Sequence, residues 1–377
     1  MPPYSSAAAL RGTSVASGLV QVMQQFADCQ IRVHTTTPSP SPLTGAEVIE
    51  IDGAEVENAS GLGSRMLGEL RMGWSAARSM LTGAQHEDLL LVSTPSYLAA
   101  LVICMRARWR DVAYVLDVRD LYPQAYAQAQ LISERGWLYR FFTARSAAMY
   151  RGARRIITAT QGLAREVESV VPRTQVDCIY NGFPSALNGR QAAKHDRFTA
   201  CFHGVLGFFQ DVETLIEVAR RLQPHGVDVV AIGYGRKEDA LRSAHVANLH
   251  FLGRLSFDET MNQIERCHVG LCLRMDDDVS RDAFPVKVWE YLGLGMPSIV
   301  TPHCEAGEFL ERHSCGIQFP AGDVDAIVSA VLRFESEHDK RGEMSAKCRS
   351  AAGSFTRERL GVEAALLVAR EWRALSS

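Results

Sequence analysis

One run in the second half of the chain combines residue types that together can hold a phosphorylated sugar. Asp282 is followed, after seven residues, by Glu290. Pro285 suits the first position of a helix, whose free N–H groups attract phosphate. Lys287 adds a positive charge in the same turn, and Glu290 can accept hydrogen bonds from two vicinal hydroxyls. With Asp282 facing a sugar, this element suits a nucleotide-sugar, although an ordinary helix with a Lys287–Glu290 pair would share part of the pattern.

Two further segments are rich in glycine and follow predicted strands, the first of them directly after His203. Their glycines are Gly204, Gly207, Gly233 and Gly235. Glycine lets the backbone approach a diphosphate, and the N-terminus of a following helix attracts anions. Arg254 follows a third strand and can reach the same diphosphate. A tight turn between strand and helix would also explain each pair of glycines taken alone.

The run over residues 282–297 resembles the acidic-x7-Glu motif of the GT-B glycosyltransferases of family 4, a group of retaining enzymes. Its Pro-x-Lys-x-x-Glu-Tyr segment is most similar to that of bacterial amino- and deoxysugar transferases, with Asp282 where most relatives have Glu. The resemblance covers nearly the whole chain. It implies that Lys287 and Asp282 act in catalysis and that Glu290, Arg254 and the glycine segments bind the donor. The donor-binding residues that it adds are Ala283, Phe284 and Pro285.

A third candidate site follows a strand of the first half. Arg119 and Asp120 end this strand, and Tyr122 precedes a proline, a run similar to the Arg-Asp-Leu-Trp-Pro run of the same subgroup. At the end of a strand, Asp120 can orient an acceptor hydroxyl or take its proton. An Arg–Asp pair or a helix cap is the alternative. Arg11, which follows Ser-Ala-Ala where the family has Gly-Gly, is assigned with Arg119 and Tyr122 to the acceptor side.

Charged segments outside these motifs bear on partners and metals. Residues 135–155 hold six arginines and no acidic residue, interleaved with aromatic residues. This favours an anionic membrane surface and a lipid-linked acceptor, with a packed helix of solvated arginines as the alternative. No base-stacking motif accompanies the charges, so nucleic acid is not expected. The triplet Asp276–Asp278 suggests a divalent metal, but the resembled family generally needs none, so we expect neither metal nor cofactor.

Composition limits the class and the compartment. The 377 residues are enough for two domains, and the net charge of −3 gives no general attraction to nucleic acid. The nine cysteines are scattered without a C-x-x-C pair, which favours reduced thiols in a cytosolic enzyme. No apolar run has the length of a membrane span and no signal peptide follows Met1. We therefore expect a cytoplasmic protein, peripheral on the inner membrane face if the basic stretch binds lipid.

Short apolar runs alternate with helical stretches, which indicates parallel sheets with helices on both faces. Together with the resemblance, this predicts an α/β protein of GT-B type, with two Rossmann-like domains whose sheets face across a cleft. We place the acceptor-side domain at residues 1–185, the nucleotide-sugar domain at 186–355, and a helix returning to the first domain at 356–377. No apolar strand precedes the helix predicted at residues 12–26, so we expect the true start to lie upstream of Met1. Strands are predicted at 31–36, 47–51, 88–93, 112–118, 155–159, 176–180, 199–203, 227–232, 249–252, 269–273, 298–301 and 316–319.

The resemblance implies a transferase that moves a sugar from a nucleotide-diphosphate sugar to an acceptor hydroxyl with retention of configuration. It implies a hexosyl or N-acetylhexosaminyl type and a place in cell-surface polysaccharide or glycoconjugate synthesis. No carboxylate pair can be assigned as nucleophile and acid, so we expect the leaving diphosphate to help take the acceptor proton. A nucleotide-sugar 2-epimerase of the same architecture and a non-catalytic nucleotide-sugar-binding partner subunit are the alternatives.

Overall fold

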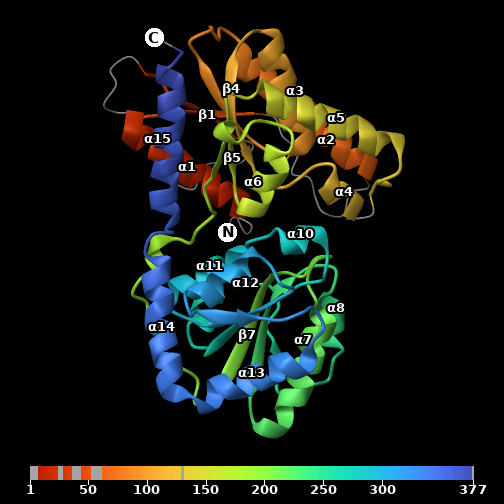
Figure 1. The fold of residues 1–377 in the computed structure, drawn as a ribbon, viewed down its shortest axis with the longest axis vertical. Coiled ribbons are helices and arrows are strands. Elements are labelled where there is room, and N and C mark those ends of the chain that lie inside the picture. The colour runs from red at the N-terminus through yellow and green to blue at the C-terminus, as the bar shows by residue number, and fades with distance from the viewer. Residues whose placement is uncertain are drawn as a thin grey trace. The chain divides into compact units, whose positions relative to one another are not determined.

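The computed structural model describes residues 7–23, 29–35, 44–51, 62–94, 96–128 and 131–375. The chain forms two units. The N-terminal unit comprises Ser5–Tyr180 and Glu358–Ser377, and the C-terminal unit comprises Asn181–Arg357. Figure 1 shows helices packed around parallel strands in both units. The segment before the first helix lies outside the described residues, so the expectation of an upstream start stays a prediction.

Six parallel strands form the sheet of the C-terminal unit, in the order β12-β11-β10-β7-β8-β9. The strands are β7 (Thr199–Val205), β8 (Asp228–Tyr234), β9 (Leu249–Phe251), β10 (Val269–Leu273), β11 (Ser298–Thr301) and β12 (Gly316–Gln318). The order reverses between β7 and β10, and open α/β sheets bind ligands outside the carboxyl ends of the strands at such a switch point. The helices are α7 (Val212–Leu222), α8 (Glu238–Arg242), α9 (Phe257–Ile264), α10 (Asp278–Arg281), α11 (Val286–Gly293), α12 (Glu305–Arg312), α13 (Val324–Ser336) and α14 (His338–Ala352).

Apolar runs and caps explain why these segments form strands and helices. All five residues of β10 are buried, as expected for a parallel strand covered on both faces. Asp211 caps α7 by accepting from the amide of Thr214 at 3.0 Å. Ser256 and Glu259 form a reciprocal capping box at the start of α9. Helices α11 and α12 cover one face of the sheet, and α7 and α13 cover the other (Figure 1).

In the described residues of the N-terminal unit, β3-β4-β5-β6 form a four-stranded parallel sheet in that order, and β1 and β2 form a two-stranded parallel sheet. The strands are β1 (Arg32–Thr35), β2 (Glu47–Glu50), β3 (Leu89–Ser93), β4 (Ala113–Val118), β5 (Arg155–Thr158) and β6 (Val176–Cys178). The helices are α1 (Ala7–Met23), α2 (Leu62–Leu81), α3 (Tyr97–Trp109), α4 (Gln124–Gln128), α5 (Trp137–Gly152) and α6 (Gln161–Glu168), with α15 (Arg357–Arg373) returning from the other end of the chain.

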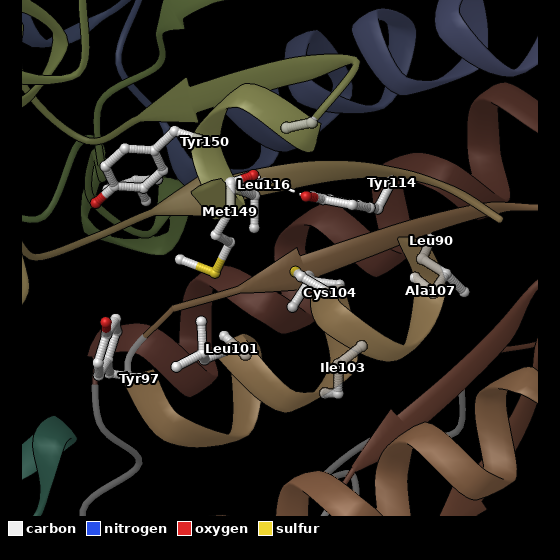
Figure 2. Packing of buried hydrophobic residues seen from close by; sticks show 14 of the residues in the cluster. Leu90, Tyr97, Leu101, Ile103, Cys104, Ala107, Tyr114, Leu116, Met149 and Tyr150 are labelled. Carbon is white, nitrogen blue, oxygen red and sulfur yellow. Dashed lines mark hydrogen bonds between the residues drawn. The ribbon is translucent and has the colours of Figure 1, made fainter. Parts of the chain in front are cut away.

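Buried side chains of α3, β4 and α5 form the core of this unit. Figure 2 shows Leu101 and Cys104 of α3 packed near Leu116 of β4 and Met149 of α5. The hydroxyl of Tyr114 is buried in this core and donates to the carbonyl of Met149 at 2.7 Å, which satisfies its polar group. The core therefore holds β4 and its carboxyl end, where Arg119 and Asp120 follow.

Helix α15 belongs to the N-terminal unit because it packs on α1 and β5. A Cβ placed on Gly18 of α1 would lie 2.5 Å from the carbonyl oxygen of Gly361, so the two helices touch at their backbones. The carboxylate of Glu371 accepts from Arg155 at 3.1 Å, which ties the end of α15 to β5. Residues at the two ends of the chain thus complete one unit.

Candidate functional site

Helix α11 carries Lys287 and Glu290 of the predicted donor motif. Pro285 is its N-cap residue and Val286 its first helical residue, so the helix begins one residue later than predicted. Phe284 stacks on Trp289 with ring centroids 4.1 Å apart, and this contact fixes the entry of the chain into the helix. The first turn of α11 therefore begins beside the carboxyl ends of β7 and β10.

Lys287 is a buried cation in this first turn. Its side chain is only 8% exposed, and its ammonium donates to the Gln210 side-chain oxygen at 2.8 Å and lies 4.0 Å from the centre of the Phe202 ring. Removal from water disfavours the charged form, which lowers the pKa of Lys287 from 10.5 to about 8. A Cβ on Gly204 would lie 3.6 Å from its Cε, so the lysine runs along the backbone of the first glycine segment.

Glu290 lies one turn further, in a buried polar network. Its Oε2 is 2.7 Å from Nε2 of His203, and its Oε1 is 3.6 Å from a guanidinium nitrogen of Arg357. Nδ1 of His203 is 3.0 Å from the hydroxyl of Tyr291. Burial lowers the pKa of His203, although the Glu290 carboxylate opposes this shift.

The two glycine segments lie against each other at the switch point. Gly204, Gly233 and Gly235 all have positive φ, at 122°, 159° and 136°. A Cβ on Gly233 would lie 2.1 Å from the carbonyl oxygen of Gly204, and one on Gly235 would lie 2.9 Å from that of Leu206. Close packing therefore requires glycine at 233 and 235, and backbone atoms line this part of the candidate site. Gly207 meets no comparable obstacle.

Two further positively charged side chains follow strands of the C-terminal sheet, Arg254 after β9 and Lys237 after β8. The Arg254 guanidinium lies 4.4 Å from the centre of the Tyr234 ring, and the preceding carbonyl, of Gly253, accepts from the amide of Gly233 at 2.9 Å. Lys237 donates to the carbonyl of Gln210 at 2.8 Å and to Glu213 at 2.9 Å. Lys237, which was not among the predicted site residues, ties the first glycine segment to the start of α8.

The acidic triplet Asp276–Asp278 makes its contacts with residues of α10. Asp277 caps α10, with Oδ1 accepting from the amide of Ser280 at 2.8 Å. Asp276 and Asp278 pair with Arg281 at 2.9 and 2.8 Å. Within the described part of the chain, no group of three or more His, Cys, Asp or Glu side chains has the arrangement to hold a metal ion. Asp282 ends α10 and is half-buried, and Ala283 follows it into the connection to α11.

The candidate acceptor residues lie after β4 in the N-terminal unit. Arg119 is largely buried, with its guanidinium 3.5 Å from the carboxylate of Asp117. Asp120 is exposed, whereas Tyr122 is buried and stacks on Tyr97 with centroids 4.8 Å apart. Arg11 lies in α1, but its side chain is outside the described part of the structure.

Comparison with known families decides the assignment of the chain. The family described as "Glycosyl transferases group 1" matches residues 186–352, and the "Glycosyl transferase 4-like domain" matches residues 14–182. The chain belongs to the family 4 glycosyltransferases. Together the two matches cover nearly the whole enzyme, and the prediction of the family from the motifs is confirmed.

Solved structures confirm the predicted GT-B fold of this glycosyltransferase. Sucrose-phosphate synthase of Thermosynechococcus elongatus has a TM-score of 0.72 at 14% identity, over 97% of this chain and 93% of its own. HepE of Anabaena, in complex with UDP-glucose, has a TM-score of 0.68 at 14% identity, over 97% and 96%. WaaG, a glycosyltransferase involved in lipopolysaccharide biosynthesis, has a TM-score of 0.67 at 12% identity, over 97% of each chain. No curated protein matches in sequence.

The structure adds residues to the donor element that the motif did not indicate. His203 and Tyr291 contact or flank Glu290, and Arg357 approaches its other oxygen. His203 was detectable as an unusual polar residue in an apolar strand just before Gly204. No sequence signal points to Arg357, which is far from the motif. None of the helices in the described ranges is long and apolar enough to span a membrane.

Proposed function

We propose that this glycosyltransferase moves a sugar from a nucleoside-diphosphate sugar to an acceptor hydroxyl with retention of configuration. The observation that carries the proposal is the buried ammonium of Lys287 beside the backbone of Gly204 at the switch point of the C-terminal sheet. Among the described residues, no carboxylate lies within hydrogen-bond distance of this ammonium, and a buried cation without such a partner is costly to maintain. A diphosphate placed along the glycine segment would supply the missing negative charge.

The remaining donor contacts follow from the surroundings of Lys287. The vicinal hydroxyls of the ribose would bind Glu290, and Arg254 would approach the diphosphate. Asp282 would contact the transferred sugar. The backbone of Gly204, Gly207, Gly233 and Gly235, and of the segment Ala283, Phe284 and Pro285, would line the donor. HepE was solved with UDP-glucose, which makes uridine nucleotides the first donors to test.

The chemistry that we propose uses the leaving group itself as the base. As the bond from the sugar to the diphosphate breaks, negative charge grows on the diphosphate next to Lys287, and this interaction strengthens in the transition state. The acceptor hydroxyl attacks from the face that the diphosphate leaves, and its proton passes to a diphosphate oxygen. Asp120, with Arg119, Tyr122 and Arg11 on the acceptor side, would orient the hydroxyl. No metal is required by this scheme.

We further propose a role in cell-surface polysaccharide or glycoconjugate synthesis at the cytoplasmic membrane face. Helix α5 supports it, because Trp137 and Phe141 are 74% and 43% exposed and the Arg145 guanidinium lies 5.1 Å from the centre of the Phe141 ring. Exposed aromatic rings beside arginine suit an anionic lipid surface. A hexose or N-acetylhexosamine on a lipid-linked acceptor would then be the product.

The test measures turnover with UDP-glucose, UDP-N-acetylglucosamine and GDP-mannose, each with and without a panel of octyl glycosides. We expect acceptor-dependent release of nucleoside diphosphate and, by NMR, a product with the anomeric configuration of the donor. Inversion would refute the mechanism. Conversion of a donor to its C2 epimer without acceptor would identify an epimerase, and binding without turnover would identify a non-catalytic subunit.

A further inference from the structure

The network around Glu290 contains a histidine with no role in the scheme above. His203 ends the buried part of β7, directly before Gly204, and is 4% exposed. Its two ring nitrogens face two different side chains of α11, Glu290 at 2.7 Å and Tyr291 at 3.0 Å. The next residues inward on β7, Phe202 and Cys201, are fully buried and apolar in character.

The positions of the protons follow from counting donors. Nε2 of His203 faces a carboxylate oxygen, so this nitrogen must carry a hydrogen. Burial lowers the pKa of His203, which favours the neutral ring, and a neutral ring with a proton on Nε2 has a bare Nδ1. Nδ1 then accepts the hydroxyl proton of Tyr291. The hydrogen bonds run in one direction, from Tyr291 to His203 and from His203 to the carboxylate of Glu290.

The hydroxyl of Tyr291 has three possible acceptors for its single proton, namely Nδ1 of His203 and two backbone carbonyls. Its oxygen lies 3.2 Å from the carbonyl of Leu271 and 3.3 Å from that of Cys201, both longer than the 3.0 Å to His203. Of these three acceptors, Nδ1 of His203 is the nearest to the hydroxyl, which agrees with the tautomer that the Glu290 carboxylate requires. Tyr291 is fully buried, so packing fixes its ring while its hydroxyl donates to Nδ1 of His203.

We infer that His203, with its hydrogen on Nε2 and its Nδ1 accepting from Tyr291, is a positioning residue that orients the Glu290 carboxylate toward the ribose hydroxyls of the donor. This inference rests on the proposed function, in which Glu290 binds those hydroxyls. A carboxylate oxygen can accept more than one hydrogen bond, so the bond from His203 holds Glu290 in one rotamer and leaves lone pairs for the ligand. Arg357, on the other oxygen, limits rotation from the opposite side.

The test compares a nucleoside diphosphate with its 2′,3′-dideoxy analogue by calorimetry on the full chain. UDP, GDP, ADP and CDP are first screened, and the tightest binder is used with its analogue. His203→Phe should weaken binding of the parent nucleotide about tenfold, the size of a lost hydrogen bond to a charged group, and leave binding of the analogue unchanged. His203→Gln keeps a side-chain N–H for Glu290 and should bind within about threefold of wild type.

Two controls separate positioning from folding. In the Glu290→Gln background, His203→Phe should have no further effect on nucleotide affinity, because its action passes through the carboxylate. His268→Phe makes the same change at the opposite end of the sheet, where the ring stacks on Phe198 at 4.8 Å, and should leave both affinities unchanged.

The outcomes distinguish the inference from the function on which it rests. Equal losses for the parent and the dideoxy nucleotide, or full additivity with Glu290→Gln, would overturn the positioning role while leaving nucleotide binding intact. Unchanged affinity in a folded His203→Phe protein would do the same. If the wild type binds none of the four nucleotides, the proposed donor site itself fails and the inference falls with it.

Discussion

Binding of a nucleoside diphosphate should draw a proton onto Lys287. With burial lowering its pKa from 10.5 to about 8, the lysine of the free enzyme is half neutral near pH 8. A diphosphate placed beside it favours the charged form and raises the pKa. Complex formation should therefore take up about 0.1 proton at pH 7, about 0.5 at pH 8 and about 0.9 at pH 9.

The same shift predicts a pH dependence of stability for the free enzyme. Between pH 8 and pH 10.5 the unfolded chain keeps the lysine proton while the folded enzyme has lost it, so the free energy of unfolding rises with pH across this window. Because Lys287 is only 8% exposed, the full shift applies, about 3 kcal/mol in total. Lys287→Met should remove this rise and stabilise the free enzyme at pH 7.

Calorimetry in pairs of buffers with different ionisation enthalpies measures the proton uptake directly. The second ionisation of a terminal phosphate lies near pH 6, so the nucleotide contributes little at pH 8 and above. Lys237→Met is the matched control, because the Lys237 ammonium also donates to Gln210, but to its backbone carbonyl and not to its side chain. It should keep the uptake, and Lys287→Met should lose it. Uptake that is absent in the wild type, or that persists in Lys287→Met, would refute the assignment of the proton to this lysine.

Three further changes test the proposed roles of other residues. Glu290→Gln should weaken binding of UDP by about 1.5–3 kcal/mol with little change in melting temperature; unchanged affinity in a titration would contradict the ribose contact. Asp120→Asn should lower kcat about a hundredfold, because the acceptor hydroxyl loses its orientation, and leave donor affinity unchanged; a kcat equal to wild type would remove Asp120 from the reaction. Replacing Arg140, Arg145 and Arg151 by Gln should reduce co-sedimentation with anionic vesicles at low salt. Replacing Arg220, Arg221 and Arg242 of the C-terminal unit should not, and equal effects of the two triple variants would count against α5.

The strands of the C-terminal unit were predictable because buried parallel strands read as uninterrupted apolar runs. Residues 269–273 and 298–301 match β10 and β11 residue for residue. Helix ends were harder, since the first helix was predicted at residues 12–26 and is described at Ala7–Met23. Apolar periodicity marks the interior of a helix more clearly than its ends, so the shared residues 12–23 were easier to predict than the boundaries.

The site was predictable only where its residues share one element. The spacing of Asp282, Lys287 and Glu290 is visible because they lie on or beside one short helix. The partners of these residues are separated from them by long stretches of chain, with Gln210 and Lys287 77 positions apart and His203 and Glu290 87 positions apart. Periodicity carries no information over such distances, so these contacts emerge only when the sheet brings β7 beside α11.

The path of the chain through its two units has a consequence for synthesis on the ribosome. The described part of the C-terminal unit is one continuous segment, Asn181–Arg357, and can complete its sheet as soon as that segment has emerged. The N-terminal unit is begun first but lacks α15 until after its partner has been made. Until then the faces of α1 and β5 that receive Gly361 and Glu371 stay open to solvent. The order in which these units mature is thus the reverse of the order in which they are translated.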